Sequence, residues 1–175
     1  MDPRSTQEPA PDEAAQRLLA ERAERIRRPP QSLDEERVLP VAEFPVGDER
    51  YAIPLAQLLE TVVLQSVTPV PLASPSIVGI FRYHGRIITV LSIASLLGVR
   101  GWRTDPAVLL IVDRGGGEVV ALDCERVPVG ISLPLSLVEV ARAGAREADV
   151  EIQVADGVVR LLDVPRLISQ RLPGR

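Results

Sequence analysis

The chain has few of the side chains that bind metals or form covalent cross-links. Its 175 residues include one cysteine, Cys124, and one histidine, His84. A single cysteine excludes an internal disulfide and any zinc site built from several cysteines. The metal ligands that remain are carboxylates, and they do not have the loop spacing typical of a calcium site. We therefore expect neither a bound metal nor another cofactor.

Aromatic residues and excess charge are also scarce. Aromatic residues make up 3% of the chain and hydrophobic residues 46%, so the core is expected to be aliphatic. The formal net charge of −4 gives no overall attraction for nucleic acid or an anionic membrane, although all twenty basic residues are arginine. No apolar stretch approaches the roughly 18 residues of a membrane-spanning helix. We expect a soluble cytoplasmic protein that does not insert into a membrane.

The first 37 residues differ from the rest of the chain. Residues 1–11 are rich in proline and polar side chains, which predicts a disordered tail. Residues 12–28 are helix formers with an acidic start, a basic end and a narrow apolar strip, and two prolines follow them. We predict an amphipathic helical extension here, either packed on its own domain or available to tether a partner. Residues 38–175 would then form the folded domain.

From residue 39 onward the pattern is typical of short strands separated by tight turns. The predicted strands cover residues 39–46, 50–54, 61–67, 77–83, 86–93, 107–113, 118–124, 126–132, 150–154 and 158–164. Short helices are predicted over residues 55–60, 94–98 and 165–172, the last closing the chain. This pattern indicates an all-β barrel or sandwich architecture. The glycines and proline of residues 98–106 suggest a seam between two sub-barrels.

The residue types needed for catalysis do not occur together in any recognisable pattern. Cys124 lies in an alternating strand, where a small buried hydrophobic residue is the commoner interpretation, so a dyad with His84 is not expected. The three glycines at 115–117 join two strands and precede no phosphate-binding helix. We predict that the protein is not an enzyme. One local cluster, Phe81-Arg82-Tyr83 with Arg86, leaves nucleic-acid binding by a small β-barrel as an alternative.

An ordered series of motifs is more specific than any of these patterns. The segments "EFPVGDERYAIPLAQLLETV" and "TPVPLASPSIVGIFRYHGRIITVLSIASLLGV" resemble the CheW-like domain of bacterial chemotaxis scaffolds. The matching positions are Gly47, Tyr51, Ala52, Ile53, Pro54, Glu60, Thr68, Pro69, Pro71, Pro75, Gly79, Gly85, Leu97 and Gly98. The second half is similar to the family through "ALDCERV" and "DGVVRLLDVPRLIS". The resemblance covers about residues 39–172.

The resemblance implies two SH3-like five-stranded β-barrels, intertwined around a shared hydrophobic core. It also implies a non-catalytic adaptor that joins a CheA-type histidine kinase to the signalling domains of methyl-accepting chemoreceptors. The protein would reach membrane-associated receptor arrays through these partners. The resemblance implies no nucleic-acid partner. By this resemblance the partner-binding residues are Glu60, Gly79, Arg82, His84, Gly85, Arg86 and Ile88.

The chain departs from the family pattern at several polar positions. His84 stands where the family usually has an arginine before the turn glycine, and histidine is charged only near or below about pH 6.5. Ser92 and Glu125 each replace a usual aspartate, and Thr89 replaces a usual proline. These differences leave open a variant function, a kinase-binding module that has lost receptor coupling. They also leave open whether Arg82 or Arg86 supplies the missing charge.

Overall fold

The computed structural model describes residues 37–99 and 107–172, which form ten strands and three helices. The strands are β1 (Val38–Val46), β2 (Glu49–Pro54), β3 (Leu58–Val63), β4 (Ile77–Tyr83), β5 (Arg86–Leu91), β6 (Val108–Gly115), β7 (Glu118–Cys124), β8 (Val129–Pro134), β9 (Asp149–Val154) and β10 (Gly157–Leu162). The helices are α2 (Ile93–Leu97), α3 (Leu135–Arg142) and α4 (Val164–Arg171). The tail and helix predicted within residues 1–37 lie outside the described residues, apart from Arg37.

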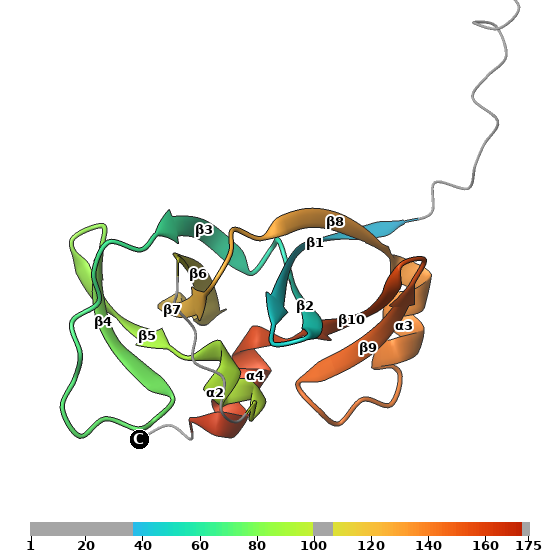
Figure 1. The fold of residues 1–175 in the computed structure, drawn as a ribbon. Helices are drawn as coiled ribbons and strands as arrows, with labels where there is room; N and C mark the ends of the chain where they lie inside the picture. Colours follow the sequence, from blue (N-terminus) through green and yellow to red (C-terminus); the bar gives the residue numbers. More distant parts are fainter. Residues whose placement is uncertain (1–36, 100–106, 173–175) are drawn as a thin grey trace, which may run out of the picture. The chain divides into compact units, whose positions relative to one another are not determined.

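The strands form two five-stranded sheets, and each sheet takes strands from both halves of the chain (Figure 1). Barrel 1 has the order β8-β1-β2-β10-β9, and barrel 2 has the order β3-β6-β7-β5-β4. After β2 the chain leaves barrel 1 for barrel 2, and after β7 it returns. The predicted all-β fold with two intertwined SH3-like barrels is therefore confirmed.

The two barrels have matching internal layouts. Each contains an antiparallel hairpin, β1–β2 or β6–β7, joined to a second hairpin, β9–β10 or β4–β5. The junction is a short parallel contact in both cases, Tyr51 beside Arg160 in barrel 1 and Ala121 beside Val90 in barrel 2. A helix follows the last strand of each half, α2 after β5 and α4 after β10. The chain thus carries the same strand order twice.

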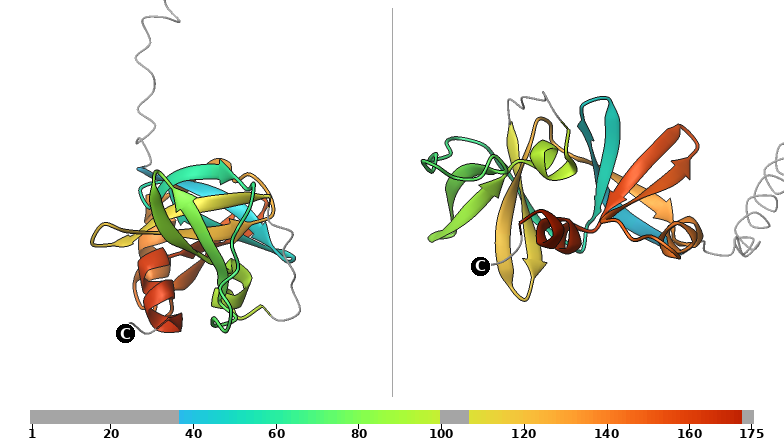
Figure 2. Two further views of the ribbon diagram at one scale, coloured as in Figure 1. Left: turned by 90° about the vertical axis from the view of Figure 1, so that its left-hand side faces the viewer. Right: turned by 90° about the horizontal axis from the view of Figure 1, so that it is seen from below.

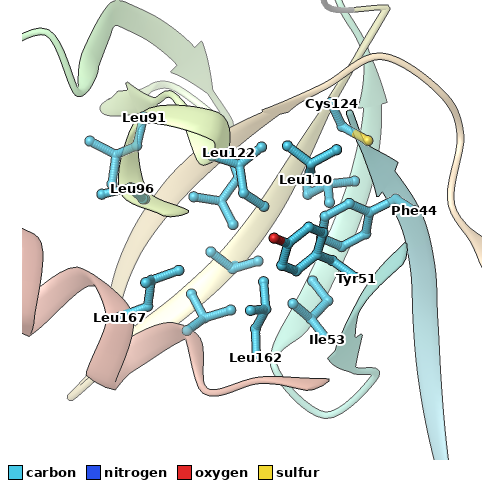
Figure 3. Close-up of a cluster of buried hydrophobic side chains, with 14 of the residues drawn as sticks. Phe44, Tyr51, Ile53, Leu91, Leu96, Leu110, Leu122, Cys124, Leu162 and Leu167 are labelled. Carbon is cyan, nitrogen blue, oxygen red and sulfur yellow. The ribbon is translucent and has the colours of Figure 1, made fainter. Parts of the chain in front are cut away.

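One aliphatic core joins the two barrels (Figure 3). Phe44, Tyr51 and Ile53 from barrel 1 meet Leu110 and Leu122 from barrel 2, and all five are fully buried. Helices α2 and α4 pack against each other and close this core (Figure 2). Smaller clusters fill the inside of each barrel separately. The exchange of strands and the common core tie the two barrels into one folded unit.

Turn and cap residues account for the elements that the sequence predicts correctly. The turns at residues 47–48, 84–85 and 115–117 all contain glycine with positive φ, which such hairpins need. Gly98 ends α2 in the left-handed conformation, with φ of 76°. Strand β8 begins just after Pro128 and lies at the edge of barrel 1, as expected for a strand next to proline.

Three predictions fail. Residues 55–60 do not form a helical turn, because only residues 55–57 turn and Leu58 begins β3, which pairs with β6. The strand predicted over 61–67 is the second half of this β3, which ends at Val63. The stretch 98–106 does not separate the barrels, because β3–β5 before it and β6–β7 after it share one sheet. The sequence analysis also missed α3, an amphipathic helix with only Val138 fully buried.

No helix within residues 37–99 and 107–172 is long and apolar enough to span a bilayer.

Candidate partner-binding site

The β4–β5 hairpin tip carries most of the residues predicted to bind partners. Its turn is Tyr83-His84-Gly85-Arg86, and Tyr83 pairs with Arg86 across it. His84 and Gly85 both have positive φ, 45° and 78°, which is the pattern of a type I′ turn. Asparagine or aspartate is the commoner first residue of such a turn, but histidine also tolerates this region. At this turn the side chain of His84 is largely exposed, at 73%.

Glu60 meets this hairpin from the other edge of barrel 2. The Tyr83 hydroxyl donates a hydrogen bond to Glu60 Oε2 at 2.9 Å, and His84 Nε2 lies 3.3 Å from the same oxygen. The Tyr83 and His84 rings pack edge to face, with centroids 4.2 Å apart. Because Glu60 belongs to β3 and the rings to the β4–β5 hairpin, these contacts link the two edge strands of the sheet. We call these three residues the edge cluster.

The contacts of the edge cluster shift the pKa values of Glu60 and Tyr83. The hydrogen bond from Tyr83, and after it the contact with His84, holds the pKa of Glu60 below its ordinary value. The same Glu60 contact raises the pKa of the Tyr83 hydroxyl. Glu60 therefore stays ionised at neutral pH, and an ion pair with His84 forms only when the imidazole is protonated.

Three residues of the hairpin remain free for a partner. Arg82 and Arg86 are exposed, and within the described part of the chain neither guanidinium pairs with a carboxylate. Ile87, next to Arg86, is 71% exposed. Two adjacent isoleucines in a strand must face opposite sides, so one of the pair 87–88 had to point outward, a signal that the sequence analysis did not use. The hairpin offers two cations and one apolar side chain.

Two of the predicted partner-binding residues present little side-chain surface. Ile88 is buried in the core of barrel 2. Gly79 is buried in β4, and a Cβ atom at this position would lie 2.4 Å from Thr68 O and 2.6 Å from Val67 Cγ1. The backbone of Thr68 makes two hydrogen bonds to Ile80, so glycine is needed here for the approach of the loop. The partner-binding role of both residues stays a prediction, whereas their packing role is clear.

The charged residues of barrel 1 mostly pair among themselves. Arg160 is flanked by carboxylates from β2 and β9, at 3.0 Å from Glu49, 3.2 Å from Asp149 and 3.3 Å from Glu151. The Tyr51 hydroxyl donates to Glu49, and this contact, opposed by desolvation and aided by Arg160, lowers the pKa of Glu49. Three carboxylates around one guanidinium leave this cluster with a formal charge of −2 at pH 7, opposite in sign to the two arginines of the barrel 2 hairpin.

A buried carboxylate that the sequence analysis did not single out fixes the start of α2. Asp123, at the end of β7, is 3% exposed, and its Oδ1 accepts a hydrogen bond of 2.7 Å from the Ile93 N–H. Ser92 also caps this helix, accepting from the Ser95 N–H at 3.4 Å. The place of Asp123 in the motif "ALDC" gave no sign of burial other than the apolar residues on both sides of it.

Among the described residues, no group of three or more histidine, cysteine, aspartate or glutamate side chains could hold a metal ion. Cys124 is buried, and burial raises the pKa of its thiol, so it is a poor nucleophile. Its Sγ donates to the Arg126 carbonyl rather than to any base. Cys124 and His84 therefore do not form a nucleophile–base pair with each other.

Comparison with known proteins agrees with this architecture. Among solved structures, the scaffolding protein TtCheW from Thermoanaerobacter tengcongensis superposes with a TM-score of 0.68 at 19% identity, covering 79% of this chain and 97% of that one. This likeness establishes the fold.

Two characterised proteins are similar in sequence. Chemotaxis protein CheW of Helicobacter pylori is 27% identical over 100 residues, which is 57% of this chain and 61% of that protein, less than two thirds of its length. Protein FrzA of Myxococcus xanthus is 28% identical over 132 residues, 72% of this chain and 82% of FrzA. The model of the CheW-like domain matches residues 40–172, which include nearly all of both barrels. The chain therefore belongs to the CheW-like domain family.

Proposed function

We propose that this protein is a non-catalytic adaptor that couples methyl-accepting chemoreceptors to a CheA-type histidine kinase. The observation that carries this proposal is a CheW-like domain spanning residues 40–172, with two unpaired arginines at an exposed hairpin tip. An adaptor needs stable surfaces for two partners, and two barrels held by one core provide them. We place the protein in the cytoplasm, at receptor arrays that it reaches through its partners.

The hairpin tip is the surface that we assign to the receptor. Arg82 and Arg86 supply permanent positive charge on either side of His84, while Ile87 adds an apolar contact. Charges of this kind set the register and rate of association, and a buried apolar anchor supplies most of the affinity. The edge cluster keeps the tip in place by joining it to β3.

A kinase-binding module without receptor coupling is the second candidate, and His84 is the observation that favours it. If the missing permanent charge at residue 84 abolishes receptor binding, then His84→Arg should restore it and leave kinase binding unchanged. Nucleic-acid binding has less support, because Tyr83, one of the two local rings available for base stacking, is already engaged by Glu60 and His84.

The test is titration of the purified chain with the cognate kinase and, separately, with a receptor signalling domain. We expect binding to both, and we expect the double variant Arg82→Glu/Arg86→Glu to weaken receptor binding by about tenfold or more. Arg126→Glu is the matched control, because Arg126 is an exposed arginine in a loop outside the hairpin. Binding to neither partner by a well-folded chain would overturn the proposal, and receptor binding that is unaffected by the double variant would remove the hairpin from it.

A further inference from the structure

The loop between β3 and β4 contains a leucine in a backbone conformation that leucine rarely adopts. Leu72 has a φ of 60°, and the Ala73 N–H donates to the Val70 carbonyl at 3.4 Å across a four-residue turn. Proline at the second position and positive φ at the third are the pattern of a type II turn. Glycine or asparagine normally fills the third position, because a larger side chain is strained there.

In the described structure, packing of the Leu72 side chain does not offset this strain. The Leu72 side chain is fully exposed, at 106% of its reference area, whereas the other exposed large apolar residues reach at most 77%. Pro71 lies within the turn and Pro69 precedes it, so both restrict its backbone, and Val70 is also exposed. Strained residues kept where the fold gains nothing from them are characteristic of binding sites.

The chemistry of the segment indicates what it would bind. No charged residue occurs between Glu60 and Arg82, although charged residues make up 25% of the whole chain. Phosphates of nucleic acids and anionic lipid headgroups are bound through arginine or lysine, so this loop suits neither. An uncharged, rigid turn that presents one leucine fits an apolar pocket on a folded protein.

Within this loop, the turn at residues 70–73 is separated from the hairpin tip that we assign to the receptor. This end of the loop leads into β4 and the hairpin follows the other end of the strand, so the two lie at opposite ends of β4 (Figure 1). Seven residues of strand at about 3.3 Å each place them roughly 20 Å apart. One small partner surface would not reach both the turn of the loop and the hairpin tip. An adaptor needs a second surface for its second partner, and the turn is separate enough to serve as one.

We propose that Leu72 is the preorganised anchor by which this chain docks into an apolar pocket of its histidine-kinase partner. This inference rests on the proposed adaptor function. The two prolines restrict the turn before binding, so less conformational entropy is lost when the complex forms. Because the contact is uncharged, its affinity should depend little on salt, in contrast to that of the arginine-bearing hairpin.

The decisive variant is Leu72→Asn, because it should affect stability and binding in opposite directions. Asparagine tolerates positive φ, so we expect the midpoint of thermal unfolding to rise by about 2–4 °C. Removal of the anchor should weaken binding of the purified kinase by about tenfold or more in calorimetric titrations at two salt concentrations. Receptor binding should stay within about twofold of the unchanged chain.

Two further variants make the result specific. Leu72→Met keeps an apolar side chain and should bind the kinase within about threefold of the original. Val127→Asn is the matched control, because Val127 is 66% exposed in a loop and does not have positive φ. It should alter neither stability nor kinase binding. If Leu72→Asn binds the kinase as tightly as the unchanged chain, or weakens only receptor binding, the inference is wrong. If the unchanged chain binds no kinase at all, the proposed function fails instead.

Discussion

Replacement of Gly79 by alanine is the sharpest test of how barrel 2 is held together. The new Cβ would lie 2.4 Å from Thr68 O, where ordinary contacts begin at 3.4 Å, so the loop must retreat by about 1 Å. That retreat weakens the two hydrogen bonds between Thr68 and Ile80, of 3.0 and 2.8 Å. Each is worth about 0.5–1.5 kcal/mol, and the overpacking adds about 1–3 kcal/mol. We expect Gly79→Ala to lower the free energy of unfolding by about 2–6 kcal/mol.

Urea denaturation followed by circular dichroism measures this change, and Gly130 provides a matched control. Gly130 also lies in a strand, β8, but no atom lies within 4 Å of a Cβ built on it and its φ is not positive. Gly130→Ala should therefore change stability by less than about 0.5 kcal/mol, or raise it slightly by restricting the unfolded chain. A loss for Gly79→Ala no larger than that for Gly130→Ala would refute the proposed steric role.

Three other predictions follow from buried or paired groups. Asp123→Ala should lower the free energy of unfolding by about 1–3 kcal/mol, because the buried Ile93 N–H loses its acceptor, and Asp123→Asn should cost less; urea midpoints compare them. Cys124 should react with a thiol reagent at pH 8 only after unfolding, since burial raises the pKa of its thiol, and rapid labelling of the native protein would contradict this. The lowered pKa of Glu60 adds stability above its ordinary value near 4.5, and this stability is lost as pH falls through the lower folded-state pKa. The stability difference between the original chain and Glu60→Gln should accordingly shrink from pH 6 to pH 3, and a constant difference would argue against the edge cluster.

Hairpins could be predicted from the sequence because their signals are local. Gly47-Asp48, His84-Gly85 and the glycines at 115–117 each mark a turn between two apolar alternating runs. Residues 55–60 misled the analysis because leucine and glutamate favour helices in isolation. In the fold, Leu58 and Glu60 pair with β6, and this non-local contact overrides the local preference. The exchange of strands between barrels leaves no local pattern, so only the family resemblance predicted it.

In the candidate site too, individual residues could be predicted from the sequence, but the contacts between distant residues could not. Glu60 and His84 were both singled out through the resemblance, but their contact at 3.3 Å joins residues 24 positions apart on opposite edges of a sheet. No periodicity encodes such a meeting. Burial was equally invisible for Asp123, whose carboxylate is used inside the fold. Leu72 was missed because a leucine between prolines does not reveal the sign of its φ.

The path of the chain between the barrels has a consequence for how the protein folds. A fragment ending at Val99 holds two strands of barrel 1 and three of barrel 2. Residues 107–172 hold the other three strands of barrel 1 and the other two of barrel 2. Neither fragment can complete a barrel, so each should remain unfolded alone and the two should regain structure only when mixed. Because partners far apart in sequence must meet before either barrel closes, folding should be slow and cooperative, with no stage at which one barrel stands alone. A newly synthesised chain would then remain exposed to proteases and aggregation until its C-terminal strands have left the ribosome.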